Sequence, residues 1–194
     1  MARPRVHDEH LATRLVEATS AVLAERGAPG VTVREVAGLA GTSASAVYSL
    51  FGSREALVSA VAAEAVRRFE AHLSAVRVGP DPMADLFELG LAYRRSALAD
   101  PHFYRVMFGP AARPDAASAV SRPAFRVLLA AGERTGTDQP LDPALGLWAL
   151  AHGLVTPELA GPLPGGEPER SARYRDALAA CGPALVGSAP LRRA

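Results

Sequence analysis

The sequence predicts an all-α fold, in which a small N-terminal helical domain is joined by one long helix to a larger helical domain. Apolar residues recur at helical spacing, as in Leu11, Leu15, Ala18 and Val22 near the N-terminus. Clusters of glycine and proline, such as GPDP and GPLPGGEP, separate the apolar segments. No stretch sustains the alternation of apolar and polar residues that a half-buried strand requires, so we expect no sheet.

Composition restricts the class of protein. Hydrophobic residues make up 49% of the 194 residues, yet no apolar run approaches the ~20 residues of a membrane span, and no signal-peptide core follows the first residues. The single Cys181 excludes an internal disulfide framework and a multi-cysteine metal site. The chain has no Lys, Asn or Ile, and its net charge of +1 leaves DNA binding to a local basic surface. We expect a cytoplasmic protein with no membrane, cofactor or metal partner.

The expected helices follow one another along the whole chain. The first covers residues 10–26, two short helices lie within 32–51, and a long helix spans 54–76. Further helices are expected at 83–98, 101–107, 116–131, 143–159 and 167–181. The expected domains are 9–69, with the two short helices at 32–51, and 70–187.

The two short helices carry cap signals at both ends. Thr32 followed by Glu35 is a capping-box pattern, in which each side chain bonds to the other residue's backbone N–H. Gly41 ends the first short helix, Ser43 caps the second, and Gly52 ends it. Two capped helices joined by a tight turn form a helix-turn-helix, whose second helix can lie in the major groove of DNA. The expected joint consists of Val36, Ala37, Ala40, Val47 and Phe51, packed on Leu15, Ala18 and Val22.

The segment VTVREVAGLAGTSASAVYSLFGSREALVSAV, preceded by HLATRLVEATSAVLAERG, resembles the DNA-binding region of the TetR family of bacterial transcriptional regulators. The likeness covers roughly residues 9–69. It implies a homodimeric transcriptional regulator, a repressor, that binds a palindromic double-stranded DNA operator. It also implies release by a small-molecule effector of unknown identity, bound in the C-terminal domain.

The resemblance also assigns candidate DNA contacts. Tyr48 and Arg54 correspond to family residues that usually touch phosphates, and packing alone is the alternative for Tyr48. Thr32 and Arg34 are placed for phosphate or groove contact. The residues that would face the bases, with capping alone as the alternative for the serines, are Thr42, Ser43, Ala44, Ser45 and Ser49.

Three positions depart from the family pattern. Position 44 often carries a basic residue, position 46 a threonine and position 50 a tyrosine or histidine in that family, whereas this chain has Ala44, Ala46 and Leu50. The reading face is therefore mostly hydroxyl and methyl groups, which suit thymine methyls and the backbone better than bidentate guanine contacts. Arg3 and Arg5 form either an arm that enters the minor groove or a disordered start.

The segment LGLWALAHGLVTPELAG is apolar on nearly every side, so most of its circumference should be buried. Its W-x-x-x-H-G pattern resembles a C-terminal domain type found in part of the TetR family. Trp148 and His152 share a face, and His152 is either a hydrogen-bonded core residue or a pocket contact. Pro157 should kink or break this helix. Together with the 167–181 helix and their symmetry mates, it is expected to form a four-helix dimer interface.

The segment YRRSALADPHFYRVMFG supplies the other ligand-pocket candidates. Aromatic residues and methionine at helical spacing form either core or the wall of a ligand cavity. Arg94 either binds an acidic effector or is a solvated surface residue. The complete set of ligand-pocket candidates is Arg94, His102, Phe103, Tyr104, Met107, Trp148 and His152.

Catalytic motifs are missing from the sequence. It contains no G-x-S-x-G, no H-E-x-x-H and no P-loop. We therefore expect no enzymatic activity. The competing hypothesis is a protein of the same fold with little or no operator binding, which acts as a small-molecule-binding or protein-binding module.

Overall fold

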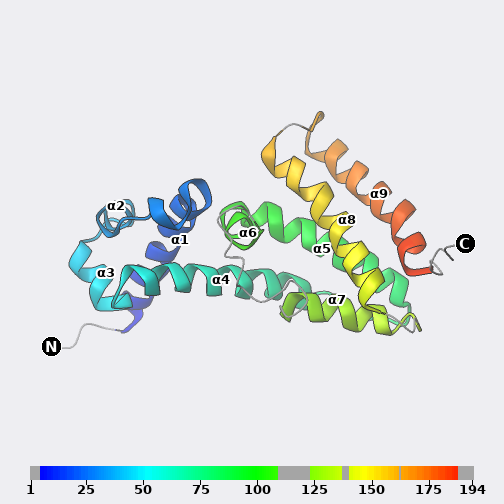
Figure 1. The fold of residues 1–194 in the computed structure, drawn as a ribbon, viewed down its shortest axis with the longest axis horizontal. Helices are drawn as coiled ribbons and strands as arrows, with labels where there is room; N and C mark the ends of the chain where they lie inside the picture. The colour runs from blue at the N-terminus through cyan, green and yellow to red at the C-terminus, as the bar shows by residue number, and fades with distance from the viewer. Residues whose placement is uncertain (1–4, 109–122, 137–139, 162, 188–194) are drawn as a thin grey trace, which may run out of the picture. The chain divides into compact units, whose positions relative to one another are not determined.

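The computed structural model describes residues 5–108, 123–136, 140–161 and 163–187. Every regular element in these ranges is a helix, which confirms the all-α prediction (Figure 1). None of these helices has the length and apolar character needed to span a bilayer. The helices are α1 Arg5–Gly30, α2 Val33–Leu39, α3 Ala44–Phe51, α4 Arg54–Ser74, α5 Pro82–Ala99, α6 Pro101–Phe108, α7 Pro123–Glu133, α8 Leu141–Ala160 and α9 Glu167–Gly187.

The helix limits differ from the expected ones at several ends. Arg5 is already part of α1, so the described part of the expected arm is helical, and Arg3 lies outside the described residues. The first residues of the helix expected at 116–131 also lie outside them. Of the two predicted effects of Pro157, a kink or a break, the break is wrong, because α8 continues to Ala160. Proline removes one N–H donor, and the carbonyl that loses it belongs to Gly153, which is exposed to solvent.

The chain forms two compact units. The N-terminal unit contains residues 1–68 and 100–116, and the C-terminal unit contains residues 69–99 and 117–194. Helix α6 therefore belongs with the N-terminal helices, although the sequence analysis assigned its residues to the C-terminal domain. The physical reason is its apolar face, which is buried in packing against α1. That face consists of Phe103, Tyr104, Val106 and Met107.

The core of the N-terminal unit lies under the two short helices. Leu15 of α1, Val36 of α2 and Val47 of α3 are fully buried, and so is Leu57 of α4. Ala37, Ala40 and Val22 are also buried as expected, whereas Ala18 and Phe51 are only half-buried. The short helices are thus held by tertiary packing, which helices of two turns require.

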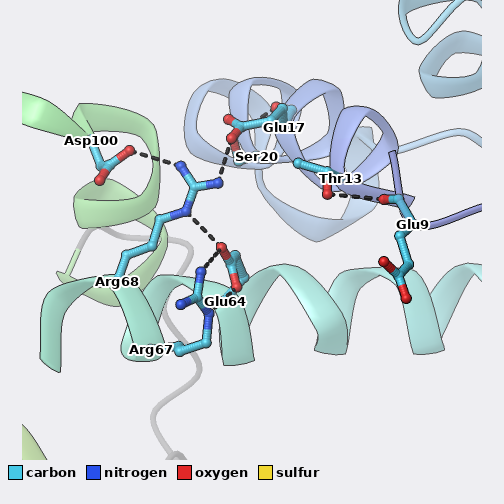
Figure 2. Close-up of polar contacts among 8 residues, drawn as sticks. All are labelled: Glu9, Thr13, Glu17, Ser20, Glu64, Arg67, Arg68 and Asp100. Carbon is cyan, nitrogen blue, oxygen red and sulfur yellow. Dashed lines mark hydrogen bonds and ion pairs between the residues drawn. The ribbon is translucent and has the colours of Figure 1, made fainter. Parts of the chain in front are cut away.

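Arg68 of α4 joins three helices of the N-terminal unit (Figure 2). Its guanidinium donates to Glu64 Oε1 at 2.7 Å, to Asp100 Oδ1 at 2.9 Å and to a carboxylate oxygen of Glu17 in α1. The same group lies over the ring of Phe103 in α6, 4.2 Å from its centroid. One side chain therefore binds α1, α4 and the start of α6 to one another.

Glu64 remains ionised in this cluster. Hydrogen bonds from Arg67 and then Arg68 lower the pKa of its carboxyl from 4.5 to about 2, although partial burial opposes the change. The Glu64 carboxylate is therefore charged at neutral pH, and the strength of the cluster depends on the cation at its centre.

Replacing Arg68 with methionine should lower the free energy of unfolding by about 2–3 kcal/mol, because three carboxylates then face one another without the cation. Arg67→Met is the matched control: the Arg67 side chain bonds to the same Glu64 but is 67% exposed, so its loss should cost less than about 1 kcal/mol. Urea denaturation at fixed protein concentration, followed by circular dichroism, measures both. Equal decreases in the free energy of unfolding of the two variants would contradict the conclusion that Arg68 is the central cation of the cluster.

Candidate nucleic-acid interface and effector site

The helix-turn-helix is fixed by side-chain caps. The N–H of Glu35 donates to Thr32 Oγ1 at 3.3 Å at the start of α2, and the N–H of Ala46 donates to Ser43 Oγ at 3.2 Å at the start of α3. Both predicted caps are confirmed. Between the helices Gly41 has a φ of +65°, which favours glycine and allows the chain to turn.

The second half of the predicted capping box takes another form. The Glu35 carboxylate accepts a hydrogen bond from the guanidinium of Arg26 in α1. A charged donor attracts a carboxylate more strongly than the backbone N–H of Thr32 does. Glu35 consequently ties α2 to α1.

Helix α3 has one buried and one exposed side. Val47 is fully buried and faces the core. Tyr48 is 53% exposed, which argues against packing as its only role. Of the other predicted contacts, Thr32, Arg34, Ser43, Ser45 and Ser49 are exposed, and Thr42 and Ala44 are half-buried.

Arg54, a predicted phosphate contact, is already engaged. Its guanidinium donates to the carbonyl of Val31 at 2.7 Å, to the carbonyl of Ala28 and to Glu55 at 3.1 Å. Both carbonyls follow Gly27, whose φ of +69° interrupts α1. Arg54 thus holds the connection between α1 and α2, and this contact could not be predicted from a motif.

The α6 candidates for a ligand pocket lie in the N-terminal unit. Phe103, Tyr104 and Met107 are buried there, and Phe103 lies beneath the guanidinium of Arg68. His102 is half-buried on the same helix. These contacts support the core interpretation for the two aromatic residues and the methionine.

Arg94 is neither solvated nor open to an acidic ligand. It is 6% exposed and donates two hydrogen bonds to the carboxylate of Glu158 in α8, at 2.6 and 2.8 Å. It also reaches Glu167 of α9 at 3.4 Å. These bonds, above all those to Glu158, raise the pKa of Arg94. Arg94 therefore binds α5 to α8 and α9, and both sequence interpretations of it are wrong.

Trp148 and His152 form part of an aromatic cluster. Their rings stack with centroids 5.3 Å apart, and His152 Nδ1 lies 3.1 Å from the hydroxyl of Tyr93 in α5. The Tyr93 ring also packs edge-on against Phe69 of α4. Burial lowers the pKa of His152. These contacts favour the hydrogen-bonded core interpretation of His152.

A cavity of about 260 Å³ lies in the C-terminal unit. Its walls come from α5, α7 and the segment after α4, and most of them are apolar. None of the seven predicted pocket residues lines it. Its lining consists of Val76, Arg77, Val78, Asp85, Leu89, Val127, Ala130, Ala131 and Arg134. We call it the α5–α7 cavity.

One ion pair fixes the polar side of the α5–α7 cavity. Arg134, which follows α7, donates to the carboxylate of Asp85 in α5 and, at 2.6 Å, to the carbonyl of Gly79. Asp85, which is buried, also accepts from the N–H of Gly79 at 2.9 Å. Arg134 and then Gly79 lower the pKa of Asp85. Sequence reasoning missed this site, because no local spacing links residues so far apart. Among the described residues, no group of three or more His, Cys, Asp or Glu could hold a metal ion.

Two family profiles match the chain. The profile described as "Bacterial regulatory proteins, tetR family" matches residues 15–61, which include α2 and α3. The profile described as "Tetracyclin repressor-like, C-terminal domain" matches residues 86–181. The chain belongs to the TetR family. It is therefore a DNA-binding transcriptional regulator and not an enzyme.

Solved structures of other regulators share the fold of this TetR-family protein. A TetR family transcription regulator from Marinobacter aquaeolei VT8 has a TM-score of 0.69 and 22% identity, covering 90% of this chain and 98% of its own. A transcriptional regulator from Rhodococcus sp. Rha1 has a TM-score of 0.64 and 25% identity, and the match covers 87% of this chain and 94% of the regulator. PfmR, a TetR family transcriptional regulator from Thermus thermophilus, has a TM-score of 0.62 and 22% identity, covering 93% and 100%. No curated protein matches the chain.

Trp148 is the only tryptophan of this TetR-family regulator, so its fluorescence reports on His152. A protonated imidazole quenches a stacked indole more strongly than a neutral one. Because burial lowers the pKa of His152 below its ordinary value of 6.5, emission should fall only once the pH is below that ordinary value. The stability that the neutral ring contributes is full above the unfolded pKa and decreases as the pH falls through it. A fluorescence titration measures the step, His152→Gln should remove it, and a midpoint above 6.5 would contradict the burial effect.

Proposed function

We propose that this TetR-family protein is a homodimeric repressor that binds a palindromic operator and is released by a small-molecule effector. Each subunit inserts α3 into the major groove, and the two grooves are about one helical turn (~34 Å) or somewhat more apart. The observation that carries the proposal is the exposure of Ser45, Tyr48 and Ser49 on a helix whose opposite side is anchored by Val47. Such a helix can enter a groove without losing its core contacts.

The proposed contacts fall into three groups. Tyr48 and Arg34 bind phosphates, since both are exposed on the two helices of the helix-turn-helix. Arg54 acts mainly through the α1–α2 connection that its guanidinium holds. The residues that approach the groove or the bases are Thr32, Thr42, Ser43, Ala44, Ser45 and Ser49.

We further propose that α8 and α9 form the dimer interface with the same helices of a second copy. The two helices lie side by side (Figure 1). Ala180 and Cys181 on α9 are small and exposed, so they permit close approach of a partner helix. A two-fold axis beside this pair of helices gives a four-helix interface, and the two-fold symmetry of the dimer is what a palindromic operator requires.

The α5–α7 cavity is the proposed effector site. Its aliphatic lining and volume of about 260 Å³ suit a small, largely apolar molecule, and the Asp85–Arg134 pair supplies the polar contacts that orient a ligand. Release requires the effector to prefer the conformation in which the two reading helices are wrongly spaced. Helix α4, which runs from Arg54 to Ser74, is the covalent link that transmits such a change.

Arg34→Ala should lower operator affinity and reduce the slope of log K against log salt by about 1, the effect of removing one phosphate contact. Tyr48→Phe should weaken binding by between about twofold and tenfold and leave the slope unchanged, because it removes a neutral hydrogen bond. Arg95→Ala, at an exposed arginine of α5, is the control and should change neither. Filter binding at several salt concentrations, on DNA flanking the protein's own gene, measures all three.

The same assay separates the competing function. A wild-type protein that binds neither this DNA nor any selected duplex at low salt would favour the small-molecule-binding or protein-binding module over the repressor.

Ala130→Trp should abolish the response to the effector while leaving operator binding unchanged, because Ala130 lines the α5–α7 cavity and is exposed at its edge. A compound library is first screened for molecules that release the operator. The concentration of the active compound needed for release should then rise about tenfold or more in the variant, which corresponds to a loss of ~1.4 kcal/mol. Ala84→Trp, at an exposed site of α5 outside the lining, should respond as the wild type does. An unchanged response of Ala130→Trp would locate the effector elsewhere.

A further inference from the structure

We infer that α3 recognises its operator mainly through the C5 methyl groups of thymines, and not through paired hydrogen bonds to guanine or adenine. This inference rests on the proposed function, because it names the base feature that the DNA-binding face reads. It follows from the types of side chain that are present on α3 and from the types that are absent from it.

Paired hydrogen bonds to bases require long polar side chains. Guanine is read by Arg or Lys and adenine by Asn or Gln. The whole chain has no Lys and no Asn. Helix α3, with the sequence ASAVYSLF, also contains no Arg and no Gln. Helix α3 therefore cannot form either paired contact.

The neighbouring cations do not replace them. Between Val31 and Arg54, the only basic residues of the sequence are Arg34 and Arg54. The guanidinium of Arg54 is bound to two backbone carbonyls and to Glu55. Arg34 is on α2, so it contacts the backbone beside the groove rather than the bases beneath α3. This leaves base recognition to short side chains.

Tyr48 is the proposed phosphate contact, so the side chains that α3 and its turn offer to the bases are hydroxyl and methyl groups. Ser45 and Ser49 are exposed, but a hydroxyl both donates and accepts, so it discriminates poorly between bases. The hydroxyl of Ser43 is already used as the α3 cap. The methyl groups of Thr42 and Ala44 are partly exposed at the start of the helix. In the major groove, the base feature that apolar groups recognise is the thymine methyl.

Uracil substitution tests the inference directly. The full-length protein first selects its operator from random duplexes, and each thymine of the half-site is then replaced by deoxyuridine, which removes only the methyl group. We expect the affinity to fall about fourfold for a critical thymine in one half-site and roughly fifteenfold for both, the effect of losing one buried methyl each. 5-Methylcytosine at the same position of a C·G pair should bind more tightly than unmodified cytosine.

Two conservative variants identify the protein partner of the methyl group. Thr42→Ser keeps the hydroxyl and removes the methyl, and Ala44→Gly removes the methyl of the neighbouring site. One of these two variants should bind the thymine operator and the uracil operator with equal affinity at one position of the half-site. The control Ala63→Gly, at an exposed site of α4, should retain the full difference in affinity between the two operators. Such a loss of coupling separates a methyl contact from a general weakening of the helix.

Three outcomes would overturn the inference. Affinity that is unchanged by uracil but lowered by 7-deazaguanine would mean that guanine is read, with Arg34 as the reader. Affinity that neither base analogue changes would mean that the shape of the duplex is read. Failure to select any duplex at low salt would overturn the proposed function together with the inference, so this result is distinguishable from the other two.

Discussion

The structure depends on the ion pair between Arg68 and Asp100. The chain leaves the N-terminal unit after Arg68 and enters it again at Asp100, so this ion pair joins the residues on the N-terminal side of two of the boundaries between the units. Glu17 of α1 and Phe103 of α6 both contact the guanidinium of Arg68. Arg68 is the last residue of α4 that belongs to the N-terminal unit, and it fixes α6 on α1. An eight-residue helix such as α6 would not be stable without such contacts.

This arrangement has a consequence for regulation. Helix α5, which precedes α6, belongs to the C-terminal unit, and that unit contains the α5–α7 cavity. Under the proposal that an effector binds there, its effect reaches the helix-turn-helix through the covalent crossings next to Arg68 and Asp100. The charges that stabilise the N-terminal unit are located at these crossings, and α1, which packs against α3, carries one of them at Glu17.

The parts of the molecule that sequence predicts well are those fixed by neighbouring residues. The caps at Thr32 and Ser43, the glycine turn and the burial of Val47 depend on spacings of three or four residues, which a pattern displays. The place of α6, the partners of Arg94 and the Asp85–Arg134 pair depend on residues far apart in the chain, 49 to 73 positions for the two arginines. Several surfaces satisfy the same apolar pattern, and only the tertiary contacts decide which one is used. Of the predicted effector residues, Phe103, Tyr104 and Met107 are buried and Arg94 is engaged in ion pairs, and no sequence pattern pointed to the α5–α7 cavity.

The use of arginine in place of lysine accounts for both the ion pairs inside the protein and the composition of the DNA-binding face. The chain has no lysine, so every structural cation is a planar guanidinium with several donors in fixed directions. Arg54, Arg68 and Arg94 each use that geometry to bind two or three groups at once, which a single ammonium on a flexible stem does less well. An arginine engaged in this way is not available to a base or a phosphate. Helix α3 contributes no cation of its own, and apart from Tyr48 its exposed side chains are short hydroxyl and methyl groups, which is why we infer that its selectivity comes from close fit in the groove.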